Sequence, residues 1–181
     1  MDNLKLIKAN RYKDKRGFFA ETYSVKKYDE IGITADFVQD NHSVSYNSGT
    51  LRGLHFQAPP NAQSKLVRCG RGAIFDVAVD IRKGSPTYGF WKGFELTASN
   101  GHQLYVPIGF AHGFITLQPE SEIVYKCSDF YAPETEGCIL WSDPDIGIEW
   151  PINLDPSLSE KDEKAPLLKD LENPFVYGVN A

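Results

Sequence analysis

Short stretches in which apolar and polar residues alternate run through most of the chain, and clusters of Gly, Pro, Asn and Asp separate them. In the clearest stretch, residues 73–82, every second residue from Phe75 to Ile81 is apolar, whereas Asp76 and Asp80 fall on the opposite face. Alternation with a period of two is typical of β-strands. The same pattern predicts strands at residues 35–40, 51–57, 64–70, 88–97, 103–106, 112–117 and 122–129. We therefore expect an all-β fold, an antiparallel sandwich or barrel.

Helical signals are few and short. Residues 25–31, which Gly32 follows, predict one helix, and residues 164–171 predict a short turn. The segment 151–181 is polar and punctuated by proline, so we expect a loop and short helix packed on the barrel rather than a second domain. Residues 1–181 are thus interpreted as a single domain.

Composition and charge limit the classes of partner. The chain has 181 residues, of which 41% are apolar and 13% aromatic, enough for one sizeable core. The net charge of −5 argues against a broad nucleic-acid interface but allows a small anionic ligand. Three cysteines without paired spacing indicate reduced thiols, and no apolar stretch has the length of a signal sequence or membrane span. We expect a cytoplasmic protein without nucleic-acid or membrane partners.

Two histidines lie in contexts rich in glycine and aromatic residues: His55 in LRGLHFQ and His112 in GFAHGF. A glycine beside a strand histidine leaves backbone room for a ligand, and an imidazole can accept a proton near neutral pH. A hydrogen-bonded structural histidine in the core is the alternative interpretation. From the residues alone, both interpretations stay open.

Several other kinds of site lack their sequence signals. No histidines are spaced as His-x-His or clustered with cysteine as in zinc sites, so no metal is expected. The chain also contains no G-x-S-x-G nucleophile motif, no G-x-G-x-x-G dinucleotide motif and no Walker motif. Nothing in the sequence therefore calls for an organic cofactor.

Two arginines beside glycine, Arg16 and Arg52, suggest contacts with phosphate, because a guanidinium fork and open backbone suit that group. Arg52 and His55 have opposite parity, so a regular strand would send their side chains to opposite faces. If both side chains serve one site, Gly53 must interrupt the strand as a bulge or irregularity.

Taken together, the motifs resemble the dTDP-4-dehydrorhamnose 3,5-epimerase family. The matching segments occur in the order DKRGFFAE, FVQDNHS, LRGLHFQ, SKLVRC, IFDVAVDIRKGSPTYGFW, VPIGFAHGF, VYKCSDFYAPE, DPDIGIEWP and LSEKD, between Asp14 and Asp162. The resemblance implies a cupin-type jelly-roll β-barrel, a homodimer, and catalysis without a metal or organic cofactor.

The same resemblance implies four catalytic residues. His55 is similar to the family's base and Asp162 to the carboxylate that orients it, while Tyr125 matches the proton donor and Lys65 the group that stabilises charge on the C4 oxygen. Contacts with the dTDP-sugar substrate are implied for Arg16, Phe19, Glu21, Gln39, Asn41, Arg52, His112, Glu136 and Lys161. The segment around Arg16 is expected to reach the partner's site in the dimer, and Asp80 is a plausible partner for His112.

The resemblance thus implies an epimerase that inverts C3 and C5 of dTDP-4-dehydro-6-deoxy-D-glucose through enolate intermediates. Removal of a proton beside a ketone requires that negative charge move onto the carbonyl oxygen, where a lysine can meet it. Two alternatives remain. One is an enzyme that inverts only C3 or C5 of a related nucleotide 4-keto-sugar, and the other is a non-catalytic cupin module that binds sugar nucleotides.

Overall fold

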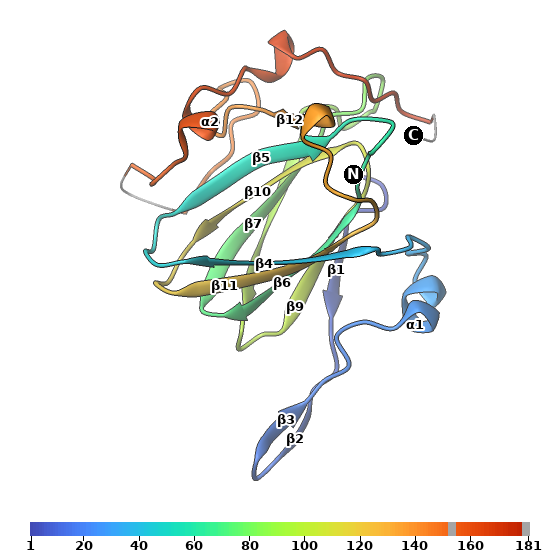
Figure 1. Ribbon diagram of the computed structural model, residues 1–181, viewed down its shortest axis with the longest axis vertical. Coiled ribbons are helices and arrows are strands. Elements are labelled where there is room, and N and C mark those ends of the chain that lie inside the picture. Colours follow the sequence, from blue (N-terminus) through green and yellow to red (C-terminus); the bar gives the residue numbers. More distant parts are fainter. Residues whose placement is uncertain (152–154, 179–181) are drawn as a thin grey trace.

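Two five-stranded antiparallel sheets face each other in the computed structural model, which describes residues 1–151 and 155–178 (Figure 1). The first sheet has the order β1-β9-β6-β11-β4, formed by Lys5–Lys8, His102–Val106, Lys65–Arg71, Ser121–Cys127 and Gln39–Ser45. The second has the order β12-β5-β10-β7-β8, formed by Glu136–Cys138, Leu51–Gln57, Phe110–Thr116, Ala73–Asp80 and Trp91–Thr97. The predicted all-β class is confirmed, although the two sheets keep separate edges instead of closing into one hydrogen-bonded barrel.

The core between the sheets explains why apolar and polar residues alternate along the strands. Inward-facing residues of both sheets, such as Val67 and Ile123 of the first and Ile74 and Ala78 of the second, form one buried cluster. Asp76 lies on the same face of β7 as Ile74 and Ala78, and it is completely buried. The face of β7 that carries carboxylates is therefore the interior face.

The apolar face of β7 is covered from outside by the C-terminal part of the chain. Val77 and Val79 pack in a second cluster with Leu168 and Phe175. In Figure 1 this part of the chain runs over the second sheet. Residues 155–178 thus supply the second layer that lets a strand be buried on both faces. Residues 152–154 and 179–181 of the predicted C-terminal segment lie outside the described residues.

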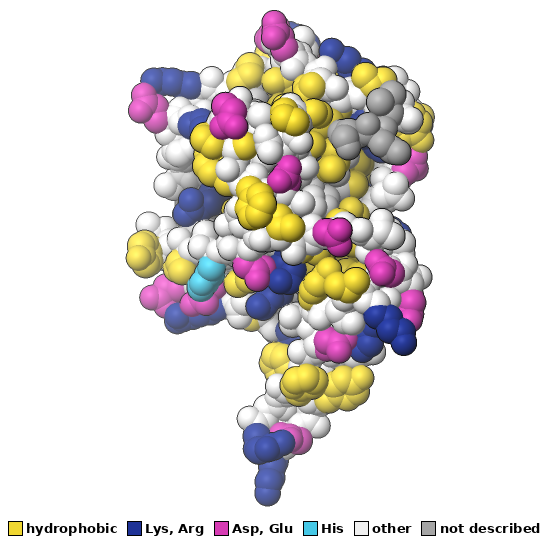
Figure 2. All heavy atoms as spheres, turned by 45° about the vertical axis from the view of Figure 1, so that its right-hand side comes forward, with side chains coloured by type: hydrophobic (Ala, Val, Ile, Leu, Met, Phe, Trp, Pro, Cys, Tyr) yellow, Lys and Arg dark blue, Asp and Glu magenta, His cyan; other side chains and the backbone are white. Residues whose placement is uncertain are grey.

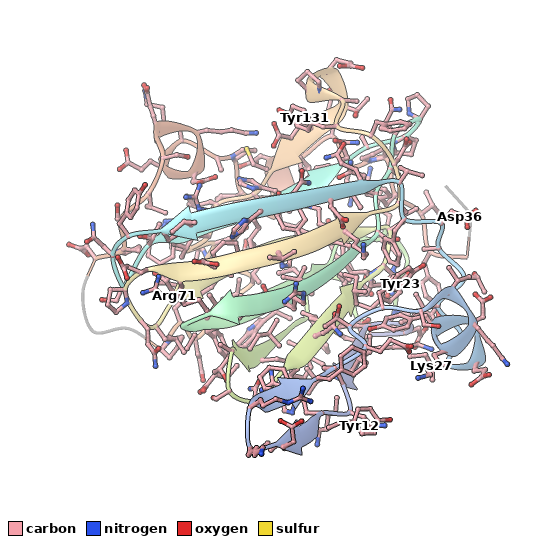
Figure 3. All side chains as sticks on the ribbon, turned by 60° about the horizontal axis from the view of Figure 1, so that its bottom comes forward. Tyr12, Tyr23, Lys27, Asp36, Arg71 and Tyr131 are labelled. Carbon is pink, nitrogen blue, oxygen red and sulfur yellow. The ribbon has the colours of Figure 1, made fainter. Side chains whose placement is uncertain are left out.

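The helices are short and peripheral. The first, α1, spans Val25–Glu30 as predicted, and Figure 3 shows it beside the first sheet, with Tyr23 and Lys27 labelled. Of the predicted turn at 164–171, only a 3-10 turn at Leu168–Asp170 forms. A second helix, α2, spans Glu160–Glu163, and a further 3-10 turn spans Pro133–Thr135. In residues 1–151 and 155–178, we find no helix with the length and apolarity needed to cross a membrane.

A two-stranded hairpin, β2 and β3 (Tyr12–Asp14 and Gly17–Phe19), projects away from the two sheets (Figure 1). Its aromatic side chains are largely exposed: Phe18 by 55% and Phe19 by 69%. Figure 2 shows a group of hydrophobic side chains where this projection leaves the body of the molecule. Aromatic surface held out in this way is typical of a contact with another molecule.

Most predicted strands formed near their expected positions. The segment 51–57 matches β5, and the other boundaries move by up to three residues, with one exception. The predicted strand 35–40 is wrong in position, because β4 runs from Gln39 to Ser45 and Phe37 instead packs against Tyr23 on the outside of the sheet. The short strands β1, β2, β3 and β12 were not predicted, since three or four residues carry too little alternation.

Candidate active site

A cleft of about 480 Å³ opens between the two sheets and contains most of the candidate residues. One wall comes from β5 and β10, the other from β6 and β11, and the chain around α2 forms part of the rim. Its lining consists of Ser43, Thr50, Leu51, Arg52, His55, Lys65, His112, Phe114, Tyr125, Glu136, Ser157, Leu158, Ser159, Lys161 and Asp162. Eight of the thirteen residues named from the sequence are in this set.

His55 on β5 is paired with a buried carboxylate from α2. Its Nε2 lies 2.6 Å from Oδ1 of Asp162, which is 2% exposed. The Ser159 hydroxyl donates to Oδ2 of Asp162, and the Asp162 N–H donates back to the Ser159 hydroxyl at the start of α2. Burial would raise the pKa of Asp162, but the bond and charge of His55, with help from Ser159 and the Gly53 N–H, lower it overall. The carboxylate is therefore ionised and fixed in orientation.

Gly53 explains how Arg52 and His55 reach the same cleft. Its φ of +127° is a conformation that side chains other than glycine rarely adopt, and a Cβ there would lie 2.5 Å from the Gly113 Cα. The register between β5 and β10 also shifts in this region. The irregularity predicted at Gly53 is confirmed, and it turns the side chains of Arg52 and His55 into one cleft.

The second histidine, His112, faces a different carboxylate from the one expected. It stands opposite His55 in the β5–β10 ladder, and its Nε2 lies 2.8 Å from Oδ1 of Asp76 on β7. The expectation that Asp80 partners His112 is wrong. Asp80 instead accepts hydrogen bonds from Arg82, Ser85 and Thr87. His112 lies opposite Ala78, midway between the two aspartates, so strand pairing alone could not decide between them.

Lys65 and Tyr125 occupy the opposite wall of the cleft. Lys65 extends from β6 and Tyr125 from β11, both in the first sheet, whereas the two histidines belong to the second. Burial lowers the pKa of Lys65, and the nearby Cys127, Glu136 and Asp76 oppose that shift. Burial also raises the pKa of Tyr125, which keeps the phenol protonated. Two proton-transfer groups thus face one space from two sides.

Charged residues close the rim near His55. The Lys161 ammonium lies 2.5 Å from the Glu136 carboxylate, which also accepts a hydrogen bond from the Tyr131 hydroxyl at 3.1 Å. The expected residues Glu136 and Lys161 are therefore part of one ion pair. Tyr131, which Figure 3 labels near this rim, was missed because an aromatic residue in a predicted loop gives no signal of its own.

Gln39 and Asn41 lie on β4, at the edge of the first sheet. Asn41 stands opposite Tyr125 in the ladder and accepts a hydrogen bond from Gln39, while its amide contacts the Cys127 thiol at 3.5 Å. Gln39 also accepts a hydrogen bond from the backbone N–H of Tyr131. These two amides thus lie beside the Tyr125 wall rather than in the lining of the cleft.

Three expected substrate contacts lie away from the cleft. Arg16 and Phe19 belong to the projecting hairpin, where Arg16 pairs with Asp14 at 2.7 Å. Glu21, just beyond the hairpin, pairs with Lys27 of α1. Within a single copy of the chain, this structure does not bring these residues together with His55.

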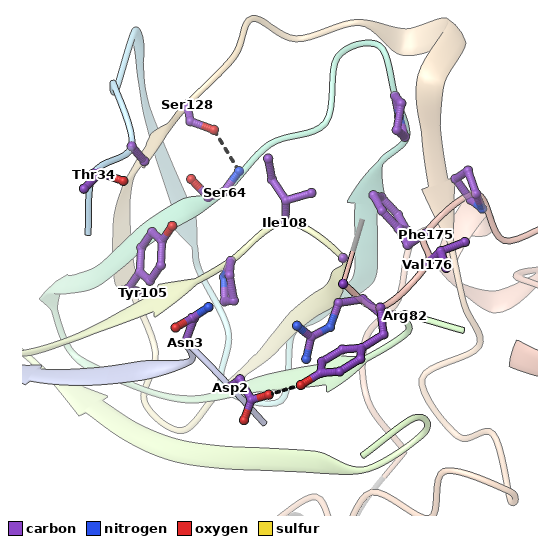
Figure 4. Close-up of a pocket in the computed structure, with 17 residues that line it drawn as sticks. Asp2, Asn3, Thr34, Ser64, Arg82, Tyr105, Ile108, Ser128, Phe175 and Val176 are labelled. Carbon is purple, nitrogen blue, oxygen red and sulfur yellow. Dashed lines mark hydrogen bonds between the residues drawn. The ribbon is translucent and has the colours of Figure 1, made fainter. Parts of the chain in front are cut away.

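A larger cleft of about 970 Å³ lies elsewhere, between the two ends of the chain (Figure 4). In this cleft, Arg82 forms a salt bridge of 2.6 Å with Asp80, which neutralises its charge. The Tyr177 hydroxyl donates a hydrogen bond to the Asp2 carboxylate. The lining of this larger cleft contains no histidine among the residues that the structure describes. The smaller cleft therefore remains the candidate active site. Neither cleft, within the described ranges, gathers three His, Cys, Asp or Glu residues as a metal ion would require.

Comparison with known proteins gives a consistent result. The family model described as dTDP-4-dehydrorhamnose 3,5-epimerase matches residues 1–170. The dTDP-4-dehydrorhamnose 3,5-epimerase of Salmonella typhimurium is 54% identical over 164 residues, covering 90% of this chain and 89% of that protein.

Solved structures agree with the sequence comparison. The dTDP-6-deoxy-D-glucose-3,5-epimerase of Legionella pneumophila, in complex with dTDP-4-keto-L-rhamnose, has a TM-score of 0.94 and 46% identity, covering 100% of this chain and 96% of that one. A dTDP-4-dehydrorhamnose 3,5-epimerase from Bacillus anthracis, with TDP and pyrophosphate bound, has a TM-score of 0.89 and 47% identity, covering 91% and 94%.

Proposed function

Because the chain belongs to the dTDP-4-dehydrorhamnose 3,5-epimerase family, we propose that it inverts C3 and C5 of dTDP-4-dehydro-6-deoxy-D-glucose to give dTDP-4-dehydro-L-rhamnose. Both carbons adjoin the C4 ketone, so one activated carbonyl serves both inversions. The separation of His55 and Tyr125 onto two sheets that share one cleft carries this proposal. Inversion requires a base on one face of the sugar ring and an acid on the other.

In the first half of each inversion, His55 removes the proton from the carbon beside the ketone. The electron pair of the broken C–H bond moves onto the C4 oxygen and forms an enolate. Lys65 stabilises that negative charge, an effect worth roughly 10²- to 10³-fold in rate for a single well-placed donor. Asp162 holds His55 through its 2.6 Å bond and stabilises the imidazolium that forms.

In the second half, Tyr125 gives its phenolic proton to the opposite face of the same carbon, and the ketone reforms. His55 then loses its new proton to solvent, and Tyr125 takes one back, which restores both groups. The sequence repeats at the other carbon. The rim residues Arg52, Glu136 and Lys161, with Gln39 and Asn41, are proposed to hold the nucleotide and diphosphate, and His112 to contact the sugar.

The proposed assembly is a homodimer in which the hairpin of each copy enters the partner's cleft. Support comes from the exposed aromatic side chains of the hairpin and from the distance of Arg16, Phe19 and Glu21 from their own cleft. Mixing Arg16→Ala with His55→Ala subunits should restore about a quarter of the activity, since a hybrid dimer contains one intact site. No recovery after verified subunit exchange would refute the shared site.

We further propose that each copy is a single domain located in the cytoplasm. The three cysteines, Cys69, Cys127 and Cys138, are all free thiols, which suits a reducing compartment. Cell fractionation with an antibody against the chain tests the location, and recovery in an oxidising compartment or the membrane fraction would refute it.

Incubation with the 4-keto substrate in D₂O tests the reaction itself. The intact protein should incorporate deuterium at both C3 and C5, and His55→Ala should lose about 10²- to 10⁴-fold in rate at both carbons. His102→Ala is a matched control, because His102 lies on β9 outside the cleft. Label at one carbon only would favour the single-carbon epimerase, and tight binding without any label would favour a binding module.

A further inference from the structure

Asp76 is the most deeply buried charged residue beside the active site. It has no exposed surface, and only its Oδ1 has a hydrogen bond, to His112. Its Oδ2 is buried with no hydrogen-bond partner among the described residues. A buried carboxylate with an unsatisfied oxygen opposes folding, so stability alone does not account for an aspartate at this position.

The geometry of His112 shows what Asp76 can do. The bond between Asp76 and the ring uses Nε2, and a carboxylate oxygen can only accept, so Nε2 carries a proton. The His112 Nδ1 has no hydrogen bond within the described part of the chain, and the residue lines the active-site cleft. Asp76 therefore settles which nitrogen remains for a ligand.

Asp76 also contributes its charge to the opposite wall. Lys65 makes no salt bridge within residues 1–151 and 155–178, and partial burial in the cleft wall lowers its pKa. The nearby Cys127, Glu136 and Asp76 act against that shift of the Lys65 pKa and so favour the protonated lysine. Of these three groups, Asp76 is the only one that also binds a histidine of the cleft.

We infer that Asp76 is a positioning residue for the epimerisation: it keeps the proton of His112 on Nε2 and turns Nδ1 toward the sugar, beside Lys65. This role rests on the function proposed above. Asp76 touches neither substrate nor reacting atoms, and it acts through His112. The hydrogen bond between β7 and β10 thereby orders the part of the cleft where the C4 oxygen is expected to sit.

Asp76→Asn tests the inference, because asparagine keeps the size and one acceptor oxygen but removes the charge. We expect kcat to fall by about 10²-fold while KM stays within about threefold, as for an interaction made mainly in the transition state. The matched control is Asp80→Asn, four residues along the same strand, which should leave kcat unchanged and lower Tm instead. Wild-type kcat in Asp76→Asn would overturn the inference.

A double-mutant cycle with His112→Ala separates positioning from a general structural effect. If Asp76 acts through His112, adding Asp76→Asn to His112→Ala should change kcat by less than about threefold. Fully additive losses would overturn the inference, since they would mean that Asp76 acts independently of His112.

An NMR measurement on the unliganded wild-type protein does not depend on any variant folding. The ¹⁵N spectrum of the His112 ring should show a proton on Nε2, and a bare Nε2 would refute the assignment. This readout also separates the two proposals. A protein that exchanges no deuterium into the keto-sugar fails the proposed function, whereas the His112 spectrum decides separately whether the proton lies on the nitrogen that faces Asp76.

Discussion

The histidines of two histidine–aspartate pairs line one cleft, and the carboxylates that bind them have different surroundings. Asp162 reaches His55 from α2, and Ser159 satisfies its second oxygen. Asp76 reaches His112 from the neighbouring strand, and its second oxygen has no partner in the described residues. The His55 side chain is 28% exposed, whereas that of His112 is 9% exposed.

The difference separates two uses of the same chemical pair. A histidine that must exchange protons with substrate and solvent needs access, and its aspartate must be held firmly in one orientation. The His55 pair has both properties. A histidine that only presents one nitrogen to a ligand can be buried, and the charge of its aspartate then reaches other groups, here Lys65. The exposure of the histidine and the hydrogen bonds of its carboxylate thus distinguish the proposed base, His55, from the proposed substrate contact, His112.

The largest expected effect follows from Asp162→Asn. We expect kcat to fall by about 10³-fold, because the amide removes the charge that stabilises the His55 imidazolium and can favour the wrong tautomer. Deuterium incorporation at C3 and C5 should decrease together, since one base serves both carbons. Steady-state kinetics and D₂O labelling measure both quantities.

Glu160→Gln provides the control for Asp162→Asn. Glu160 lies on the same helix, but its side chain is 81% exposed and, among the described residues, pairs only with Lys164. The Glu160→Gln variant should leave kcat unchanged, because an exposed ion pair contributes little. If Asp162→Asn retained kcat within threefold, the distinction between the two pairs would be lost.

A smaller effect concerns the alkaline side of the pH profile. Burial lowers the pKa of Lys65 from its ordinary value of 10.5, so this ammonium loses its proton at a lower pH than an exposed lysine. Activity should therefore decline on the alkaline side as Lys65 becomes neutral. Lys65→Arg stays charged and should shift that decline upward, although misplacement of the guanidinium should lower the plateau by about 10-fold. Profiles of kcat from pH 7 to 10.5 compare the two proteins, and coincident alkaline limbs would exclude Lys65 as their cause.

From the sequence, the His55–Asp162 pair was identified correctly, whereas the wrong aspartate was assigned to His112. His55 and Asp162 lie 107 residues apart, and only the family resemblance joined them. For His112, the alternation of residues 73–82 correctly placed Asp76 and Asp80 on one face. It could not show that Arg82, Ser85 and Thr87 would surround Asp80, because these contacts depend on the turn after β7.

The fold was predictable where burial of one strand face requires apolar residues at every second position. The alternation of β5 and β7 is strong because inward residues must be apolar or paired, and the conflict between Arg52 and His55 correctly located an irregularity at Gly53. The helix α2 was missed although Ser159 and Asp162 form a capping pattern at its start. Four residues of helix give no amphipathic period, and tertiary contacts decide whether such a turn forms.

The smallest predicted effect on catalysis belongs to Asp80, which resembles Asp76 in burial and position but binds no histidine. Its bonds to Arg82, Ser85 and Thr87 lower its pKa to about 2 in spite of burial, which acts in the opposite direction. Asp80→Asn should lower the free energy of unfolding by about 3 kcal/mol at pH 7, because Arg82 would keep a buried charge without a partner. Its kcat should match wild type.

The pH dependence of unfolding tests the same carboxylate independently. A folded pKa of about 2, below the ordinary 3.8, means that Asp80 stabilises the fold fully above about pH 4, and that this contribution disappears as the pH falls toward 2. The contribution amounts to about 2 kcal/mol, and Asp80→Asn should lack it. Denaturant unfolding between pH 2 and 7 measures the difference between the two proteins. A constant difference across that range would show that Asp80 is not held ionised by its partners, and its contrast with Asp76 would then have to rest on kinetics alone.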